Sequence, residues 1–127
     1  MSLLKGTKTA SEWIREGKSC NDHAEALRCF CQALNLEPQN RNAIFNKGVA
    51  CLNLGRCNEA LKCFEFLSEQ DPENVTLLEM KGRAYQEMHG YRKAVMVFSE
   101  ALEIVGAKAD EDIDLKRKLK RLINRSV

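Results

Sequence analysis

The stretch that decides the fold reads Gly55-Arg56-Cys57-Asn58-Glu59-Ala60-Leu61-Lys62-Cys63-Phe64. Within it Ala60 and Phe64 stand four residues apart, so on a helix they lie on one face. The same pair occurs 34 residues earlier as Ala26 and Phe30, and 34 residues later as Ala94 and Phe98. A fixed period of this size is typical of stacked helical repeats, in which each repeat buries its apolar face only against its neighbours.

Capping and turn residues delimit the expected helices. Thr9 with Glu12, and Asp22 with Glu25, form capping boxes that begin the first two helices. The other boundaries are set by N-cap asparagines and by helix-ending residues, namely Asn40, Asn74, Pro38, Gly55, Pro72 and Gly106. The sequence predicts helices over about residues 10–20, 24–37, 41–54, 57–70, 75–88, 91–105 and 110–124. Short turns make consecutive helices antiparallel.

Aligned on this period, the chain resembles the tetratricopeptide repeat (TPR) family, whose pattern is W-x2-L-G-x2-Y, then A-x3-F, then P. The first repeat reads Ala10, Trp13, Ile14, Gly17, Ala26, Phe30, Ala33, Pro38. The second reads Ile44, Lys47, Gly48, Cys51, Ala60, Phe64, Leu67, Pro72, and the third reads Leu78, Lys81, Gly82, Tyr85, Ala94, Phe98, Ala101, Gly106. The resemblance covers Thr7 to Lys108. It implies an all-α superhelix of seven antiparallel helices, with a concave groove lined by the first helix of each pair.

The residue types in this pattern have a physical reason of their own. Gly48 and Gly82 let the two helices of a pair approach closely, and the repeated phenylalanines fill the space between them. Ile14 stands where glycine is preferred, so we expect the first pair to be held slightly apart. We expect one domain over residues 7–124, with repeats at about 7–40, 41–74 and 75–108 and a capping helix at about 110–124.

The predicted capping helix is amphipathic. Its narrow apolar face consists of Leu115, Leu119, Leu122 and Ile123. Acidic residues come first, at Asp110, Glu111, Asp112 and Asp114, and basic residues follow, an order that suits the helix dipole. Repeat arrays need such a terminal helix to cover the last apolar face.

Positions at which the repeats differ indicate a binding surface. The helix over 41–54 carries a packing stripe of Ile44, Gly48 and Cys51 and a second apolar stripe of Phe45, Val49 and Leu52. The second stripe corresponds to Ser11, Arg15 and Lys18 one repeat earlier and to Glu79, Arg83 and Gln86 one repeat later. An apolar centre with a polar, mainly basic surround is typical of a peptide-binding hot spot. The alternative is that the middle helix is simply more covered than its neighbours.

We therefore predict a groove that binds a protein or peptide partner. The candidate groove residues are Arg15, Lys18, Phe45, Asn46, Val49, Leu52, Asn53, Thr76, Met80 and Arg83. Families of this kind include chaperone adaptors that hold a partner's C-terminal carboxylates in a basic and asparagine clamp. Here the clamp columns hold Ser11, Arg15, Asn46, Thr76 and Met80, of which only Asn46 matches, so the resemblance argues against that mode.

Other classes of function receive little support. We expect no enzyme and no cofactor, because no nucleophile–base pair and no glycine-rich phosphate loop is present. Six cysteines without a CxxC pair indicate free structural thiols and no metal site. In the repeat family that the chain resembles, the column of His23 usually holds an aromatic ring, so we expect His23 to pack. His89 lies in a predicted turn, where we expect it to be exposed. The first six residues are too short for a signal peptide and no apolar run could span a membrane, so we expect a cytoplasmic or nuclear location.

Two alternatives remain open. The basic residues Lys116, Arg117, Lys120 and Arg121 of the predicted capping helix could contact nucleic acid or an import receptor. The interleaved aromatic residues that favour single-strand binding are absent from this run. The other alternative is a homo-oligomer, formed through the apolar groove or through Phe66, which stands where the sister repeats have Gln32 and Glu100.

Overall fold

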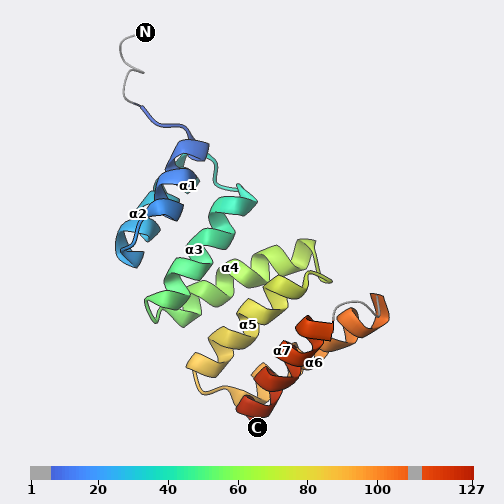
Figure 1. Cartoon of the computed structure of the whole chain (residues 1–127). Coiled ribbons are helices and arrows are strands. Elements are labelled where there is room, and N and C mark those ends of the chain that lie inside the picture. The colour runs from blue at the N-terminus through green and yellow to red at the C-terminus, as the bar shows by residue number, and fades with distance from the viewer. Residues whose placement is uncertain (1–6, 109–112) are drawn as a thin grey trace.

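Every regular element in the described part of the computed structural model, residues 7–108 and 113–127, is an α helix. In chain order these are α1 (Ala10–Ser19), α2 (His23–Leu36), α3 (Arg41–Asn53), α4 (Cys57–Gln70), α5 (Val75–Glu87), α6 (Tyr91–Lys108) and α7 (Ile113–Ser126). Each helix packs against the next, and the successive pairs stack from one end of the molecule to the other (Figure 1). The chain is therefore an all-α helical-repeat superhelix, as the period predicts.

Helix starts follow the predicted caps with one exception. The Glu12 N–H donates to Thr9 Oγ1 at 3.2 Å and the Thr9 N–H donates to Glu12 Oε1 at 2.8 Å, so the first capping box is confirmed. Asp22 does cap α2, but it accepts from the Ala24 N–H, and Glu25 contacts Arg28 one turn further on. The second capping box is thus wrong in both halves, and Asp22 acts as a simple N-cap.

The end of α6 differs from the prediction. The helix continues through Gly106 to Lys108. Its last turns carry Ala101 and Val105, which are buried in one apolar cluster with Leu119 and Leu122 of α7. This packing outweighs the roughly 1 kcal/mol by which a glycine disfavours a helix interior. Of the acidic residues predicted to begin the capping helix, Asp110, Glu111 and Asp112 lie outside the described residues.

The turns that follow α3 and α5 share one backbone geometry. After α3, the Arg56 N–H donates to the Cys51 carbonyl at 2.8 Å and the Gly55 N–H donates to the Leu52 carbonyl at 3.1 Å. This is a Schellman motif, and it requires a left-handed residue, which is Gly55 with φ 79°. The equivalent residue after α5 is His89, with φ 61°. A left-handed conformation costs a non-glycine residue about 1–2 kcal/mol.

We expect His89→Gly to raise the free energy of unfolding by about 0.5–1 kcal/mol, because it removes this backbone strain. The gain is reduced by the loss of the 2.9 Å contact between His89 Nδ1 and the Tyr91 hydroxyl. The matched change Gly55→Ala should lower stability by about 1 kcal/mol. Urea denaturation followed by far-UV circular dichroism checks both, and a His89→Gly variant less stable than the wild type would contradict the prediction.

Each helix pair is held by a phenylalanine ring that lies against a glycine. A Cβ placed on Gly48 would lie 2.7 Å from Phe64 Cε1, and one placed on Gly82 would lie closer still to Phe98 Cε1. Real Cβ atoms do not approach other atoms so closely, so only glycine fits at these positions. Phe64 and Phe98 are fully buried. The predicted role of Gly48 and Gly82 is confirmed.

The first pair makes the same contact in a different register. Phe30 lies against Gly17, where a Cβ would be 2.5 Å from its Cε1, and Ile14 is buried one turn earlier in α1. The contact therefore moves three residues along the helix, or about 4.5 Å. The expectation that Ile14 holds the pair apart is wrong, because α1 and α2 contact one another as extensively as α3 and α4 do.

We expect Gly82→Ala to lower the free energy of unfolding by about 1–3 kcal/mol, because the new methyl group would displace the Phe98 ring in a filled core. The control is Gly106→Ala, since Gly106 is also helical but a Cβ there would meet nothing within 4 Å. That change should raise stability by about 0.5–1 kcal/mol through helix propensity alone. Urea denaturation of the two variants should give shifts of opposite sign, and two shifts in the same direction would refute the packing argument.

Candidate functional site

The two predicted stripes of α3 differ in burial. Ile44, Gly48 and Cys51 are buried, whereas Phe45, Val49 and Leu52 are half-buried. The half-buried side chains pack against the larger apolar cluster of the fold, which includes Ile14, Phe30 and Phe64 and is called the main apolar cluster below. The Phe45 ring centroid is 6.0 Å from that of Phe64. The second stripe thus has one side in the core and one side in solvent. The corresponding side chains of α1, Ser11, Arg15 and Lys18, are exposed.

The third repeat departs from the prediction at Glu79. This carboxylate was expected on the groove surface, but the residue is only 5% exposed. Its Oε2 lies 3.2 Å from Arg83 Nη2 and 2.8 Å from Lys118 Nζ. A buried carboxylate is stable only when it is paired, and here the second cation comes from α7.

A second polar contact joins α7 to α5. The Gln86 Nε2 donates to Ser126 Oγ at 2.7 Å, and the buried Ser126 hydroxyl donates to the Leu122 carbonyl at 2.8 Å. Together with the Lys118–Glu79 ion pair, this contact fixes α7 alongside α5 at two points. The helix predicted as a cap therefore also lies beside the first helix of the last pair.

We expect Glu79→Gln to lower the free energy of unfolding by about 1 kcal/mol. Arg83 and Lys118 each keep 44% of their side-chain surface in water, which limits the loss. The amides of α7 should exchange with deuterium faster in this variant, because one of the two polar contacts to α5 is weakened. Glu87→Gln, an exposed carboxylate on the same helix, is the control and should leave α7 exchange unchanged. Equal exchange in the wild type and both variants would show that the ion pair does not hold α7.

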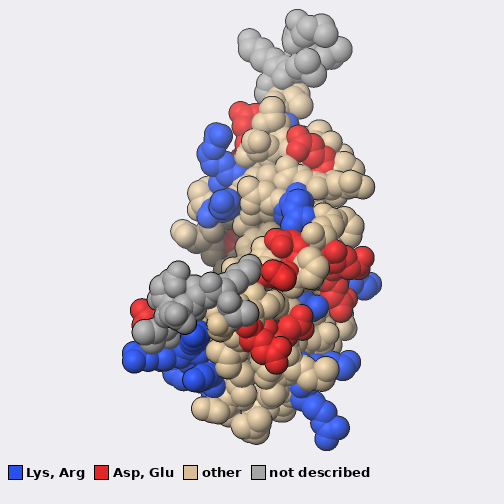
Figure 2. Space-filling view, turned by 90° about the vertical axis from the view of Figure 1, so that its right-hand side faces the viewer, with Lys and Arg blue, Asp and Glu red and all other residues tan. Residues whose placement is uncertain are grey.

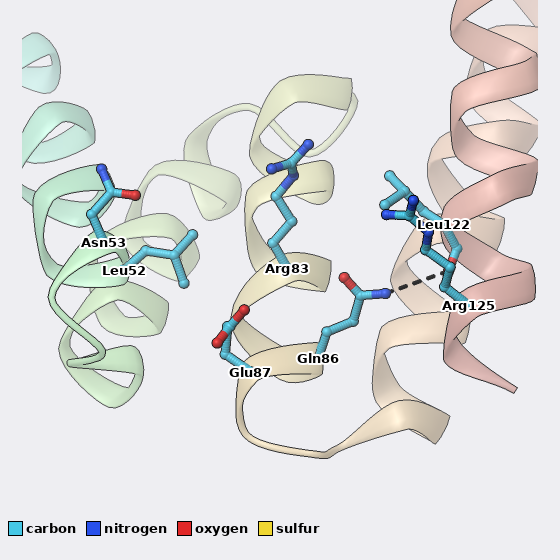
Figure 3. A pocket seen from close by; sticks show the side chains of 7 residues that line it. All are labelled: Leu52, Asn53, Arg83, Gln86, Glu87, Leu122 and Arg125. Atoms are coloured by element: carbon cyan, nitrogen blue, oxygen red, sulfur yellow. Dashed lines mark hydrogen bonds between the residues drawn. The ribbon is translucent and has the colours of Figure 1, made fainter.

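A hollow of about 430 Å³ lies between α3, α5 and α7 (Figure 3). Its lining residues are Leu52, Asn53, Arg83, Gln86, Glu87, Leu122 and Arg125. Three of the predicted groove residues, Leu52, Asn53 and Arg83, are brought together here. Glu87 and Arg125 were missed. The repeat period could have found Glu87, which occupies the column of Asn53, but no period places the residues of α7.

The other predicted groove residues lie outside this hollow. Arg15, Lys18 and Thr76 are exposed, and Met80 packs against the main apolar cluster. The Asn46 side-chain amide donates to the Asn42 carbonyl at 2.7 Å, within its own helix.

The predicted basic contact residues lie on α7. Arg117, Lys120 and Arg121 are exposed and line a separate hollow with Asp114, while Lys116 is half-buried. Figure 2 shows Lys and Arg side chains gathered at the lower left of the face that it presents. Lys118, inside the same run, contacts Glu79 instead. The run is therefore divided between the contact with α5 and the open surface.

All six cysteines are free, and each is buried or half-buried, as expected for structural thiols. Burial raises the pKa of Cys29 and of Cys51 to about 11, which keeps both thiols neutral near pH 7. Within the described residues no group of three or more His, Cys, Asp and Glu is placed to hold a metal ion. His89 is exposed in its turn, as predicted. The expectation that His23 packs is wrong, because it is exposed in the first turn of α2.

The comparisons with known proteins agree with this architecture. No protein-family model and no curated protein matches the chain in sequence. Solved structures do match. The TPR2B domain of yeast Sti1, in a structure described as a pHsp70 complex, superposes with a TM-score of 0.77 at 20% identity, over 92% of this chain and 94% of that one. The Sgt2 TPR domain from Aspergillus fumigatus gives 0.73 at 20% identity, over 92% and 76%.

A third match is the first TPR of Spaghetti (RPAP3) bound to the HSP90 peptide SRMEEVD. It has a TM-score of 0.71 at 14% identity and covers 92% of this chain and 94% of that one. The chain thus has the fold of a TPR domain. No helix within residues 7–108 and 113–127 is both long enough and apolar enough to cross a bilayer.

Proposed function

We propose that this chain is a non-catalytic interaction module that binds a peptide segment of a partner protein in its concave groove. The observation that carries the proposal is the half-buried stripe Phe45, Val49 and Leu52, which is apolar where α1 presents exposed polar side chains. Leu52 belongs both to this stripe and to the hollow between α3, α5 and α7. An apolar strip therefore leads into a polar recess, the combination that peptide-binding sites use for affinity and for orientation.

The solved TPR domains add support at the level of the fold. Two of the similar structures are described as complexes, one with pHsp70 and one with an HSP90 peptide. We expect this chain to hold its partner differently from a carboxylate clamp. Four of the five clamp columns depart from the clamp pattern, and the Asn46 side chain is hydrogen-bonded within α3. The apolar stripe is the main source of affinity in the proposal.

The test uses peptides selected from a random twelve-residue phage-display library and then synthesised with a fluorescent label. Their affinity is measured by fluorescence anisotropy against the wild type and against Val49→Ser/Leu52→Ser. We expect about tenfold or greater weakening, because truncating a central apolar contact costs 1–2 kcal/mol or more. Phe45 is left intact because its ring packs on Phe64.

The matched control is Phe66→Ser on α4, an apolar side chain that is 39% exposed outside the groove. It should leave affinity within about twofold of the wild type. Thermal unfolding of all variants verifies that they remain folded. Unchanged affinity in Val49→Ser/Leu52→Ser, or an equal loss in the Phe66 variant, would refute binding in the groove.

A further inference from the structure

The charges around the apolar stripe are arranged on both of its sides. Arg15 and Lys18 are exposed on α1, on one side of α3. Arg83 of α5 and Arg125 of α7 line the hollow on the other side (Figure 3). The apolar centre of the groove therefore lies between two pairs of cations.

These cations are only partly neutralised by the protein. Arg83 shares Glu79 with Lys118, which leaves one positive charge in excess at that cluster. Arg125 forms no ion pair with any described residue, and Glu87 is the one further carboxylate that lines the hollow. On α1, the Glu12 carboxylate accepts from the Thr9 N–H in the capping box, and this contact, more than the charge of nearby Arg15, holds the pKa of Glu12 down. Glu12 stays ionised and offsets one of the two cations of α1, while Glu16 pairs with Lys8. Each of the two clusters therefore keeps one positive charge in excess.

Resting on the proposed function, we infer that the bound segment is acidic on both sides of an apolar residue. The apolar side chain lies on Phe45, Val49 and Leu52. One carboxylate side chain lies between Arg83 and Arg125, and another lies beside Arg15 and Lys18. Each carboxylate would gain charge-assisted hydrogen bonds, which are the stronger class and the natural match for a guanidinium group.

The helix spacing sets the distance between these residues in the partner. Two helices lie at least one helix diameter, or about 10 Å, apart, and an extended chain advances about 3.3–3.6 Å per residue. Crossing from one first helix to the next therefore takes at least about three residues. The expected pattern is an acidic residue at least about three positions before and at least about three positions after the apolar one.

The assignment of Arg125 gives α7 a role in recognition beyond covering the last repeat. The cations of α7 then fall into two sets. Arg125 lines the groove, whereas Arg117, Lys120 and Arg121 line a different hollow. The two sets allow a comparison in which the charge of the helix is reduced on one face or on the other.

The experiment uses the same phage-display library and the intact chain. We expect the selected peptides to be enriched in Asp and Glu on both sides of an apolar residue, at least about three positions away from it. Synthetic, C-terminally amidated versions are then compared with versions in which one acidic residue is replaced by its amide. Each replacement should weaken binding about tenfold, since a hydrogen bond to a charged group contributes about 1.5 kcal/mol or more.

Arg125→Gln should weaken the acidic peptide about tenfold and remove its preference over the peptide lacking the acid on that side. Arg15→Gln/Lys18→Gln should do the same for the other acidic residue. Arg117→Gln/Arg121→Gln removes more charge from α7 but faces the other hollow, so it should change affinity by less than about twofold at physiological salt.

Three results would overturn the inference: no enrichment of acidic residues, an Arg125→Gln variant that behaves like Arg117→Gln/Arg121→Gln, or binding that requires a free C-terminal carboxylate and no acidic side chain. In each of these cases a loss of affinity in Val49→Ser/Leu52→Ser would still support groove binding. The proposed function itself fails if that variant binds the selected peptides as the wild type does, or if Phe66→Ser loses as much affinity.

Discussion

The contact on which the structure depends is a phenylalanine ring from the second helix of each pair, seated against a glycine of the first. It occurs as Phe30 on Gly17, Phe64 on Gly48 and Phe98 on Gly82, in each case at a distance that leaves no room for a Cβ. Seating the ring there brings the two helices close enough to bury their alanine faces. In the middle repeat this packing also reaches the surface, because the Phe64 ring supports Phe45, which belongs to the half-buried stripe of α3. The packing inside a pair thereby positions the residues proposed to bind a partner.

The first repeat shows how much variation this contact tolerates. Ile14 occupies the glycine column, yet the pair packs closely because Gly17, one turn later, accepts the ring. A helix repeats its face every three to four residues, so a glycine displaced by three positions is still presented to the partner helix. What the pair requires is a glycine within reach of the ring on the correct face, and the residue at any single column matters less.

The hollow between α3, α5 and α7 is completed by the last helix. The last helix covers the apolar face of α6 with Leu119 and Leu122, as its amphipathic pattern predicts. It also places Lys118 on Glu79 and Ser126 on Gln86, and so completes a recess whose other sides are α3 and α5. A terminal helix can therefore combine two tasks, since its apolar face stabilises the array and a neighbouring face supplies side chains to a hollow on the surface.

Much of the fold could be predicted from the sequence because its determinants are local or periodic. Caps such as Thr9 and turn residues such as Gly55 act within a few residues, and the 34-residue period identified two of the three ring–glycine pairs and the two stripes of α3. The missed contacts that shape the hollow depend on residues far apart in the sequence, whereas the failed capping box at Asp22 is a local error. Glu79 is buried because Lys118, 39 positions later, neutralises it, and Gln86 meets Ser126 across 40 positions. Because α7 lies beyond the last repeat, the period does not fix its register. Only the tertiary structure decided that Arg125 lines the hollow between α3, α5 and α7 and that Arg117 and Arg121 line a different one.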